Sequence, residues 1–321
     1  MYLLLAFLAL LTERVIGYPG WVYRLIGHPV TWIGSLISAL DTRWNRDGDP
    51  AGRRRWAGIA ALAVIISVVA SLSVILESLL LAVPLGFFVL VLVAASLPAQ
   101  KSLEEHVEAV AAALETGGLP AARIAVSMIV GRDPDNLDEP AVCRAAIESL
   151  AENFSDGIVA PVFWLGLGGL AGGAAYKAIN TADSMIGHRS PRHEAFGWAS
   201  ARLDDLVNLP ASRLSALLFI TAACLVPGAS PRSAIAAVMR DARLHRSPNA
   251  GWPEAAMAGA LGIALAGPRS YGGRMVEARF MGEGGRKDLD ASDIRRALRL
   301  ARVADALLIG AFGLAALALA L

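Results

Sequence analysis

The sequence predicts an all-α fold, namely a multispanning integral membrane helical bundle with further helical segments in the cytoplasm. Hydrophobic residues make up 55% of the 321 positions and charged residues only 18%, which is more apolar than a soluble domain of this size requires. Several apolar runs approach the roughly 20 residues that a helix needs to cross a bilayer. Lysine and arginine gather beside these runs, as is typical of the cytoplasmic side of a membrane protein.

We expect one membrane-embedded domain over residues 1–321, with spans near residues 2–17, 57–76, 79–97 and 304–321. The first run lacks the basic start and the small-residue cleavage site of a signal peptide, so it is expected to stay as a helix. Glu77 and Ser78 interrupt the long apolar run of the second and third spans, and Pro84 follows. This pattern favours a helical hairpin whose ends both face the cytoplasm.

The predicted cytoplasmic segments cover residues 98–157 and 230–302. Within the first, Ser102 with Glu105 is a capping-box pattern, and Asp138 with Pro140 is expected to cap and open a second helix. Two short apolar helices, 158–175 and 214–226, lie between the segments. Since both segments need the same side, either residues 175–208 are external between two short spans, or the short helices are re-entrant or packed inside the bundle.

Charge and cysteine content exclude some classes of protein. The formal net charge of +1 gives no electrostatic reason to expect a nucleic-acid partner. Cys143 and Cys224 lie far apart without further cysteines nearby. Neither a disulfide framework nor a cysteine zinc site is therefore predicted.

A first polar cluster begins with Glu148 and Glu152, which share a helix face at a spacing of four, and Asp156 follows one turn later. Like charges at this spacing repel each other unless a cation such as Mg²⁺ or an arginine lies between them. The alternative is an ordinary solvated helix face.

A second cluster places Lys177, Asn180 or Thr181, and Ser184 on one helix face, with Asp183 at its flank. A turn with two histidines and two arginines follows: His188, Arg189, Arg192 and His193. Cations and amides suit phosphate oxygens, and an adjacent aspartate suits the accompanying metal ion. The alternative is that His188 and His193 are plain loop residues, which a lone loop histidine is more often than a catalyst.

A third cluster forms a polar stripe on one helix, through Arg202, Asp205 and Asn208. Arg202 and Asp205 can simply pair with each other, but that pairing leaves Asp204 and Asn208 unexplained. Ionisable residues at a membrane edge are costly, which favours a functional role. Spacing alone does not separate an enzyme from a transporter.

Longer motifs carry a resemblance to a known family. They are HPVTWIG (28–34), SLEEH (102–106), IVGRD (129–133), ESLAENFSDGIVAPVFW (148–164), residues 176–208, SPNAGWPEAAMAGALG (247–262) and YGG (271–273). In this order they resemble the CbiB/CobD family of cobalamin biosynthesis over nearly the whole chain. Two positions depart from the family pattern: Tyr18, where an aspartate is usual, and Phe154, where a smaller or polar residue is common.

The resemblance implies a multipass enzyme of the cell membrane, adenosylcobinamide-phosphate synthase. Such an enzyme joins adenosylcobyric acid, a corrinoid substrate, to aminopropanol or its O-phosphate, and it consumes ATP with Mg²⁺ through an acyl phosphate. Membrane lipid is a further expected partner. Other cobalamin-assembly membrane proteins and an oligomer are compatible with the sequence, which specifies neither. The site would face the cytoplasm, where ATP and the corrinoid are found.

The resemblance marks positions, and we assign roles to them as hypotheses. Expected metal ligands are Glu152, Asp156 and Asp183; expected phosphate or cofactor contacts are Lys177, Asn153, Asn180, Arg189, Arg192 and Arg202; expected bases are His188 or Asp205. Asp183, Lys177, His188 and Asp205 form the expected catalytic group.

Two other functions stay open at this point. One is a non-catalytic membrane sensor or regulator of the same superfamily. Five residues that occur together speak against it: Glu152, Asp156, Lys177, Asn180 and Asp183. The other is a corrinoid or small-solute transporter, which would transport its solute across vesicles without forming an amide.

The expected cytoplasmic orientation can be tested with one cysteine. In a chain without Cys143 and Cys224, a Ser190→Cys variant is expected to react with a membrane-impermeant maleimide only after the cytoplasmic side is opened, because ATP and the corrinoid are found on that side. This expectation favours re-entrant or packed short helices at 158–175 and 214–226. Labelling in intact cells would overturn this topology.

Overall fold

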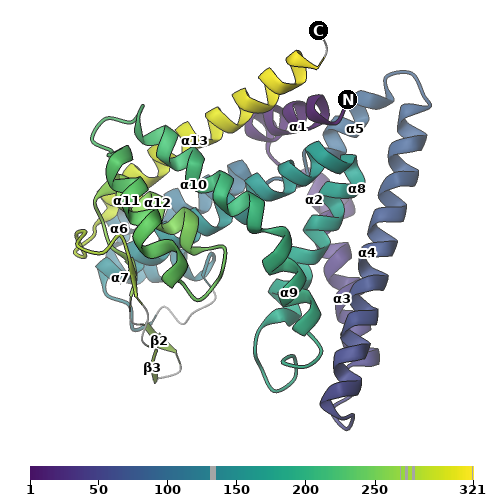
Figure 1. Ribbon diagram of the computed structural model, residues 1–321, viewed down its shortest axis with the longest axis horizontal. Helices are drawn as coiled ribbons and strands as arrows, with labels where there is room; N and C mark the ends of the chain where they lie inside the picture. The colour runs from purple at the N-terminus through teal and green to yellow at the C-terminus, as the bar shows by residue number, and fades with distance from the viewer. Residues whose placement is uncertain (131–134, 268, 272–273, 277–278, 320) are drawn as a thin grey trace. The chain divides into compact units, whose positions relative to one another are not determined.

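The computed structural model describes residues 1–130, 135–267, 269–271, 274–276, 279–319 and 321. Helices dominate this part of the chain, and the only strands in it are two short antiparallel pairs (Figure 1). The predicted all-α membrane fold is confirmed. Gly131, Arg132, Asp133, Gly272 and Gly273 of the family motifs lie outside the described residues.

The chain divides into two units, each built from segments distant in sequence. The first unit contains Met1–Ala99, Ala160–Asn208 and Phe312–Leu321, and the second contains Gln100–Val159 and Leu209–Ala311.

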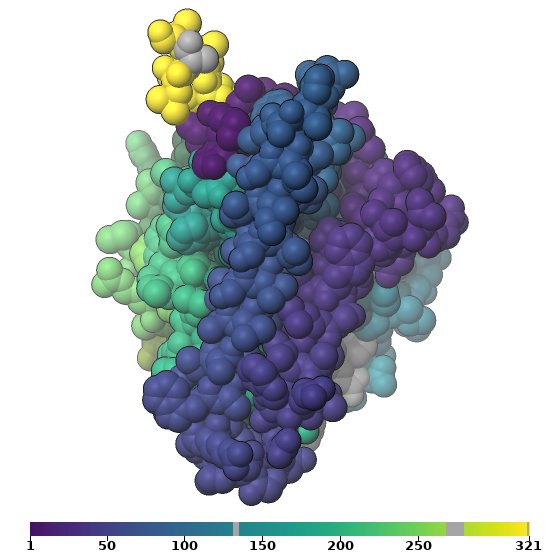
Figure 2. Space-filling model, turned by 90° about the vertical axis from the view of Figure 1, so that its right-hand side faces the viewer, coloured from purple at the N-terminus to yellow at the C-terminus, as the bar shows by residue number. Residues whose placement is uncertain are grey.

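The first unit is built around two long helices that lie against each other, α4 and α8. Its elements are α1 (Tyr2–Ile16), α2 (Gly20–Ile26), α3 (Pro29–Trp44), α4 (Ala51–Leu81), α5 (Gly86–Ala94), α8 (Ala160–Ala182), the π-helix η2 (Asp183–Gly187) and α9 (Trp198–Val207). The helix α4 packs along α3, α8 and α9, and α1 packs along α8 and α5. Figure 2 shows α4, in blue, running past the purple N-terminal helices.

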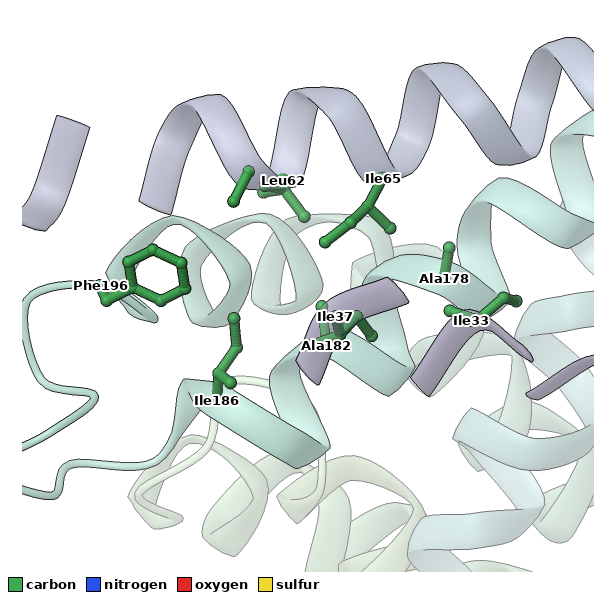
Figure 3. Packing of buried hydrophobic residues seen from close by; sticks show 9 residues of the cluster. Ile33, Ile37, Leu62, Ile65, Ala178, Ala182, Ile186 and Phe196 are labelled. Carbon is green, nitrogen blue, oxygen red and sulfur yellow. The ribbon is translucent and has the colours of Figure 1, made fainter. Parts of the chain in front are cut away.

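An apolar cluster fixes the end of α8 against α3 and α4 (Figure 3). Ile33 and Ile37 of α3 meet Leu62 and Ile65 of α4, and the cluster is completed by Ala61, Ala178, Ala182, Ile186 and Phe196. Gly58 lets α4 approach the backbone of Phe196 closely, since a Cβ atom at position 58 would lie 1.9 Å from the carbonyl oxygen of Phe196. The same packing therefore positions η2 and the loop that follows it.

Within the described residues, four helical stretches are long and apolar enough to cross a membrane, and up to six if each bent helix pair is one span. The four are Ala51–Leu81, Gln100–Ser127, Glu139–Gly187 and Ala291–Ala318; the bent pairs are Tyr2–Ile16 with Gly20–Trp44, at 107°, and Trp198–Val207 with Leu209–Ala223, at 43°. Large apolar side chains such as Leu72, Ile75 and Leu79 are exposed on α4. Such a surface suits lipid, and the chain is a membrane protein.

The hairpin after Trp56 turns later than the sequence predicts. We expected a break at Glu77 and Ser78, but α4 continues through both to Leu81, and the turn lies just before α5, where Leu85 has a φ of 62°. Glu77 does not break the helix because its buried carboxylate accepts a hydrogen bond from the backbone N–H of Leu170 at 2.8 Å.

This hydrogen bond caps an interruption in α8. Gly168 and Gly169 have non-helical backbone angles, and φ at Gly169 is +61°. The N–H groups after such a break lose their helical partners, and a carboxylate at the start of the next helical turn is a favourable acceptor. The short apolar helix expected at 158–175 is thus a π-helix, η1 (Phe154–Val159), followed by the broken helix α8, which extends to Ala182.

The second unit is also mainly helical. It contains α6 (Gln100–Ser127), α7 (Glu139–Asn153), η1, α10 (Leu209–Ala223), α11 (Pro231–Asp241), η3 (Ala242–Leu244), α12 (Gly251–Leu261), strands β1 (Leu265–Ala266), β2 (Arg269–Tyr271), β3 (Arg274–Val276) and β4 (Phe280–Met281), and most of α13 (Ala291–Ala318). β1 pairs with β4 and β2 with β3.

The two predicted helix starts in this unit differ in outcome. Asp138 caps α7 as expected, since its Oδ1 accepts the N–H of Ala141 at 2.8 Å. The capping box at Ser102 is wrong, because α6 already begins at Gln100; Ser102 contacts the ring of His106 instead.

The interruption in α8 gives a matched pair of stability variants. Gly169→Ala is expected to lower the free energy of unfolding by about 1–3 kcal/mol, because φ is positive there and a Cβ atom would lie 2.8 Å from Glu77 and 2.7 Å from Tyr2. Gly168→Ala, where a Cβ atom meets nothing within 4 Å, is the control, expected within about 1 kcal/mol of wild type. Unfolding curves in detergent measure both; equal losses would contradict the proposed close approach.

Candidate active site

The candidate site begins where α8 widens into η2. Thr181 Oγ1 donates to the carbonyl of Lys177 at 2.7 Å, and Ser184 Oγ donates to the carbonyl of Asn180 at 2.9 Å. Such side chains compete with backbone N–H groups for carbonyls four residues back, which loosens the α-helical pattern. π-Helical turns often occur at functional sites, and Asp183 is the first residue of this one.

Two cross-helix hydrogen bonds tie α8 to α9. Tyr176 Oη donates to Asn208 Oδ1 at 2.8 Å, and Asn180 Nδ2 donates to Asp204 Oδ1 at 3.2 Å. The partners lie four residues apart on each helix and run in opposite directions, as expected for one face of each of two antiparallel helices. Because Tyr176, Asn208 and Asp204 are buried, we call these two bonds the α8–α9 polar ladder.

The ladder holds Asp204 within electrostatic reach of two further carboxylates. The charges of Asp183 and Asp205 both act on Asp204, and that of His188 acts on Asp183. Gly187 lies directly against Asp183, since a Cβ atom at position 187 would be 1.9 Å from Asp183 Oδ1. The structure therefore brings together the predicted residues Asn180, Asp183, His188 and Asp205 with Asp204.

Asp204 is absent from the predicted site residues. The signal was present in the sequence, because the Arg202–Asp205 pairing left Asp204 unexplained on a polar stripe. What the sequence did not show is its burial: Asp204 is 8% exposed. A buried carboxylate beside other carboxylates is costly, which favours a functional role.

Arg202 and Asp205 do pair, with 3.7 Å between Nη1 and Oδ2. The side chains are 62% and 35% exposed, so this i,i+3 pair contributes little to stability. Neither group is locked in place by it.

The predicted turn of histidines and arginines is anchored through Arg192. Its Nη2 lies 2.9 Å from Asp41 Oδ2 of α3, and Arg54 and Asn45 both donate to the carbonyl of Arg192. The hydrogen bond to Asp41 raises the pKa of Arg192 above its ordinary value. Arg192 thus fixes the loop to α3, while His188 and Arg189 remain exposed.

Lys177 lies in the wall of a cavity inside the first unit. The cavity has a volume of about 340 Å³ and is lined mainly by apolar side chains of α3, α4, α5 and α8, including Leu36, Leu72 and Ala174. The charge of Lys177 also acts on His28, whose side chain caps the start of α3.

The remaining predicted residues belong to the second unit. Glu148 is buried and accepts the N–H of Ala266 at 2.8 Å, which is a structural role. Glu152 and Asn153 are exposed at the end of α7, and Asn153 Nδ2 donates to the carbonyl of Ser149. Asp156 lies in η1, so the α-helical spacing used to align it with Glu152 does not hold there.

The oxygen-rich group around Asp183 fits a hard divalent cation in type, since Mg²⁺ prefers carboxylates and keeps sites for phosphate and water. Among the described residues, no group of three or more His, Cys, Asp or Glu side chains is disposed to hold a metal ion. Magnesium held by one or two carboxylates together with substrate phosphates is compatible with this geometry.

The fold and this site define a helical membrane protein with a carboxylate-rich polar centre beside two of its helices. The family model described as CobD/Cbib protein matches residues 6–301. The chain belongs to this family, and its role lies in cobalamin biosynthesis.

Curated relatives support the same family assignment. A protein of Sinorhizobium sp, named Cobalamin biosynthesis protein CobD, is 52% identical over 294 residues, covering 91% of each chain. Proteins of the same name from Rhizobium meliloti (strain 1021) and Rhodobacter capsulatus are each 50% identical, covering 99% and 90% of this chain and 98% and 90% of their own. No solved structure gives a significant match.

The α8–α9 polar ladder predicts a stability loss for a conservative change. Tyr176→Phe removes the donor to buried Asn208 Oδ1 and is expected to cost about 1–3 kcal/mol of unfolding free energy. Tyr23→Phe, at a tyrosine 54% exposed, should change it by less than about 0.5 kcal/mol. Thermal unfolding of both variants in the same detergent is the measurement, and indistinguishable midpoints would argue against the ladder.

Proposed function

We propose that the protein is an ATP-dependent amide ligase that joins the free carboxylate of adenosylcobyric acid to the amine of aminopropanol or its O-phosphate. The observation that carries this proposal is the grouping of Asn180, Asp183, His188, Asp204 and Asp205 in a chain of the CobD/CbiB family. Carboxylate, amide and imidazole groups in one place suit metal-assisted phosphoryl transfer followed by proton removal.

A carboxylate does not react with an amine until one of its oxygens becomes a leaving group. In the proposed reaction the substrate carboxylate oxygen attacks the γ-phosphorus of ATP, and ADP leaves. The amine nitrogen then attacks the acyl carbon, the carbon–oxygen bond to phosphate breaks, and the nitrogen loses its proton. The protein must therefore hold phosphates, orient two substrates and accept a proton.

Magnesium bound with ATP would neutralise phosphate charge and hold the phosphates in line. We assign Asp183 and Asp204 to this cation in the first unit. The position of Asp183 at the start of η2, with Gly187 leaving room for its carboxylate, supports the assignment. Glu152 and Asp156 of the second unit remain proposed ligands from the family resemblance.

Phosphate oxygens need donors and positive charge. Lys177, Asn180, Arg189 and Arg202 are proposed to supply them in the first unit and Asn153 in the second. Arg192 is left out of the set, since its guanidinium already pairs with Asp41 and with Asp47, at 2.9 and 3.6 Å.

The amine must lose a proton as it attacks. His188 is our choice of base, because its imidazole is exposed, a ring nitrogen can accept a proton, and its charge acts on Asp183. Asp205 is the second choice, since Arg202 already pairs with it. ATP and corrinoid reach these groups from the cytoplasmic side in this proposal.

Loss of the Asp183 carboxylate tests the assignment. Asp183→Asn is expected to lower kcat/KM by about 10²–10³-fold, as removal of one preorganised charged group in an active site does. Glu194→Gln, at an exposed position of the following loop, is the matched control and should retain activity. The assay combines purified protein, adenosylcobyric acid, ATP, Mg²⁺ and aminopropanol phosphate, with mass spectrometry of the corrinoid.

Wild-type protein that forms no amide under these conditions would contradict the proposal. The two remaining functions would then be a membrane regulator or a transporter. Full activity of Asp183→Asn alongside active wild type would reject the metal assignment only.

Gly187→Ala tests the positioning of the same carboxylate without removing it. Its Cβ atom would lie 1.9 Å from Asp183 Oδ1, so the carboxylate must move. A misplacement of about 1 Å at a reacting centre can cost on the order of 10²-fold in rate. We expect a loss in kcat with normal membrane insertion; unchanged kcat would show that this position of Asp183 is not the active one.

A further inference from the structure

The second unit contains two arginines, Arg213 and Arg243, that the proposed ligase chemistry does not use. They lie where α10, η3 and the start of α12 meet, in the region of the SPNAGWPE motif. The proposed amide ligation assigns no role to any of these residues.

Arg213 of α10 is held on one edge by hydrogen bonds. Its Nη1 donates to Asn249 Oδ1 and to Ser212 Oγ, both at 2.9 Å, and to the carbonyl of Leu209 at 3.3 Å. Asn249 and Ser212 are buried. One nitrogen of the guanidinium is therefore fixed in a buried polar setting.

The face of the same guanidinium rests on an aromatic ring. Its Cζ lies 4.5 Å from the centroid of Trp252, which is a cation–π contact. One edge and one face of the guanidinium are therefore fixed. Its other two nitrogens, Nε and Nη2, make no hydrogen bond in the part of the chain that the structure describes. These two nitrogens are the fork that binds phosphate or carboxylate oxygens in pairs.

A second guanidinium lies nearby. Arg243 of η3 is exposed, and its charge acts on Arg213. Within the described residues, no carboxylate forms a salt bridge with either arginine. Two neighbouring positive charges repel each other, and a bound anion would offset that repulsion.

The backbone of η3 lies close to the first residue of α12. A Cβ atom at Gly251 would lie 2.3 Å from the carbonyl oxygen of Ala242, so only glycine lets η3 lie this close to the start of α12. The loop between them is ordered by Ser247, whose N–H donates to His245 Nδ1 and whose Oγ accepts the N–H of Asn249 and of Ala250. The two arginines are thus presented by a preorganised frame.

We propose that Arg213 and Arg243 form a binding site for a phosphate group. A phosphate dianion matches two guanidinium groups in charge and offers enough oxygens for both, whereas a single carboxylate satisfies only one fork. The phosphate belongs either to a soluble phosphate monoester or to a lipid headgroup that ends in a phosphate monoester, and both present the same dianion. The site does not depend on the proposed ligation.

Arginine footprinting tests this site residue by residue. Full-length protein in phosphatidylcholine nanodiscs is treated with phenylglyoxal at constant ionic strength, with and without inorganic phosphate, and modification is read by peptide mass spectrometry. Phosphate is expected to protect Arg243 saturably and to leave Arg232 unprotected. Arg232 is an exposed arginine near the start of α11, whereas Arg243 follows the end of that helix. The helical rise between the two positions is about 16 Å.

Variants sharpen the result. Arg213→Gln is expected to raise the phosphate concentration for half-protection of Arg243 by about tenfold or more, as loss of a charge-assisted hydrogen bond does. Arg232→Gln removes the same charge and should change it by less than about twofold.

The source of the phosphate is read from a second nanodisc. Protection of Arg243 by phosphatidic acid alone, with no further effect of inorganic phosphate, would identify a lipid headgroup. Protection by inorganic phosphate in both nanodiscs would identify a soluble ester. Equal modification of Arg243 and Arg232 under all conditions would overturn the site.

Discussion

The hydrogen bond from Asn180 to the buried Asp204 is the interaction on which the candidate site depends. It fixes one carboxylate between α8 and α9, and the Tyr176–Asn208 bond fixes the register of the same two helices one turn away. Asp183 and Asp205 then lie within electrostatic reach of Asp204. A carboxylate kept out of water beside two others is costly to fold, and the apolar cluster around Ile37 and Ile65 supplies the packing that holds this end of α8 in place.

Two glycines shape the backbone of α8 and of the π-helical turn that follows it. Gly169 lets α8 break and bring Leu170 N–H to Glu77, and Gly187 leaves space for the carboxylate of Asp183. Neither glycine contributes chemistry of its own. Each leaves room for one carboxylate: Gly169 for that of Glu77 at the interruption in α8, and Gly187 for that of Asp183 at the π-helical turn.

Much of the fold could be predicted from apolar run length, since α1, α4 and α13 lie where long apolar runs occur. The end of α4 could not, because the partner that makes Glu77 tolerable is Leu170, 93 positions away. At the site, helical spacing grouped Asn180 with Lys177 and marked Asp183. Spacing failed at Asp156 because η1 is not α-helical, and it left Asp204 unexplained because burial is a tertiary property.

The central claim is that this centre activates a carboxylate by phosphorylation. Oxygen tracing tests it most directly: adenosylcobyric acid with ¹⁸O at both oxygens of its free carboxylate is converted with ATP and the amine, and the mass of the released phosphate is measured by mass spectrometry. An acyl phosphate requires one ¹⁸O atom to appear in inorganic phosphate for each amide formed. Amide formation with unlabelled phosphate, or with the label in AMP, would contradict the account.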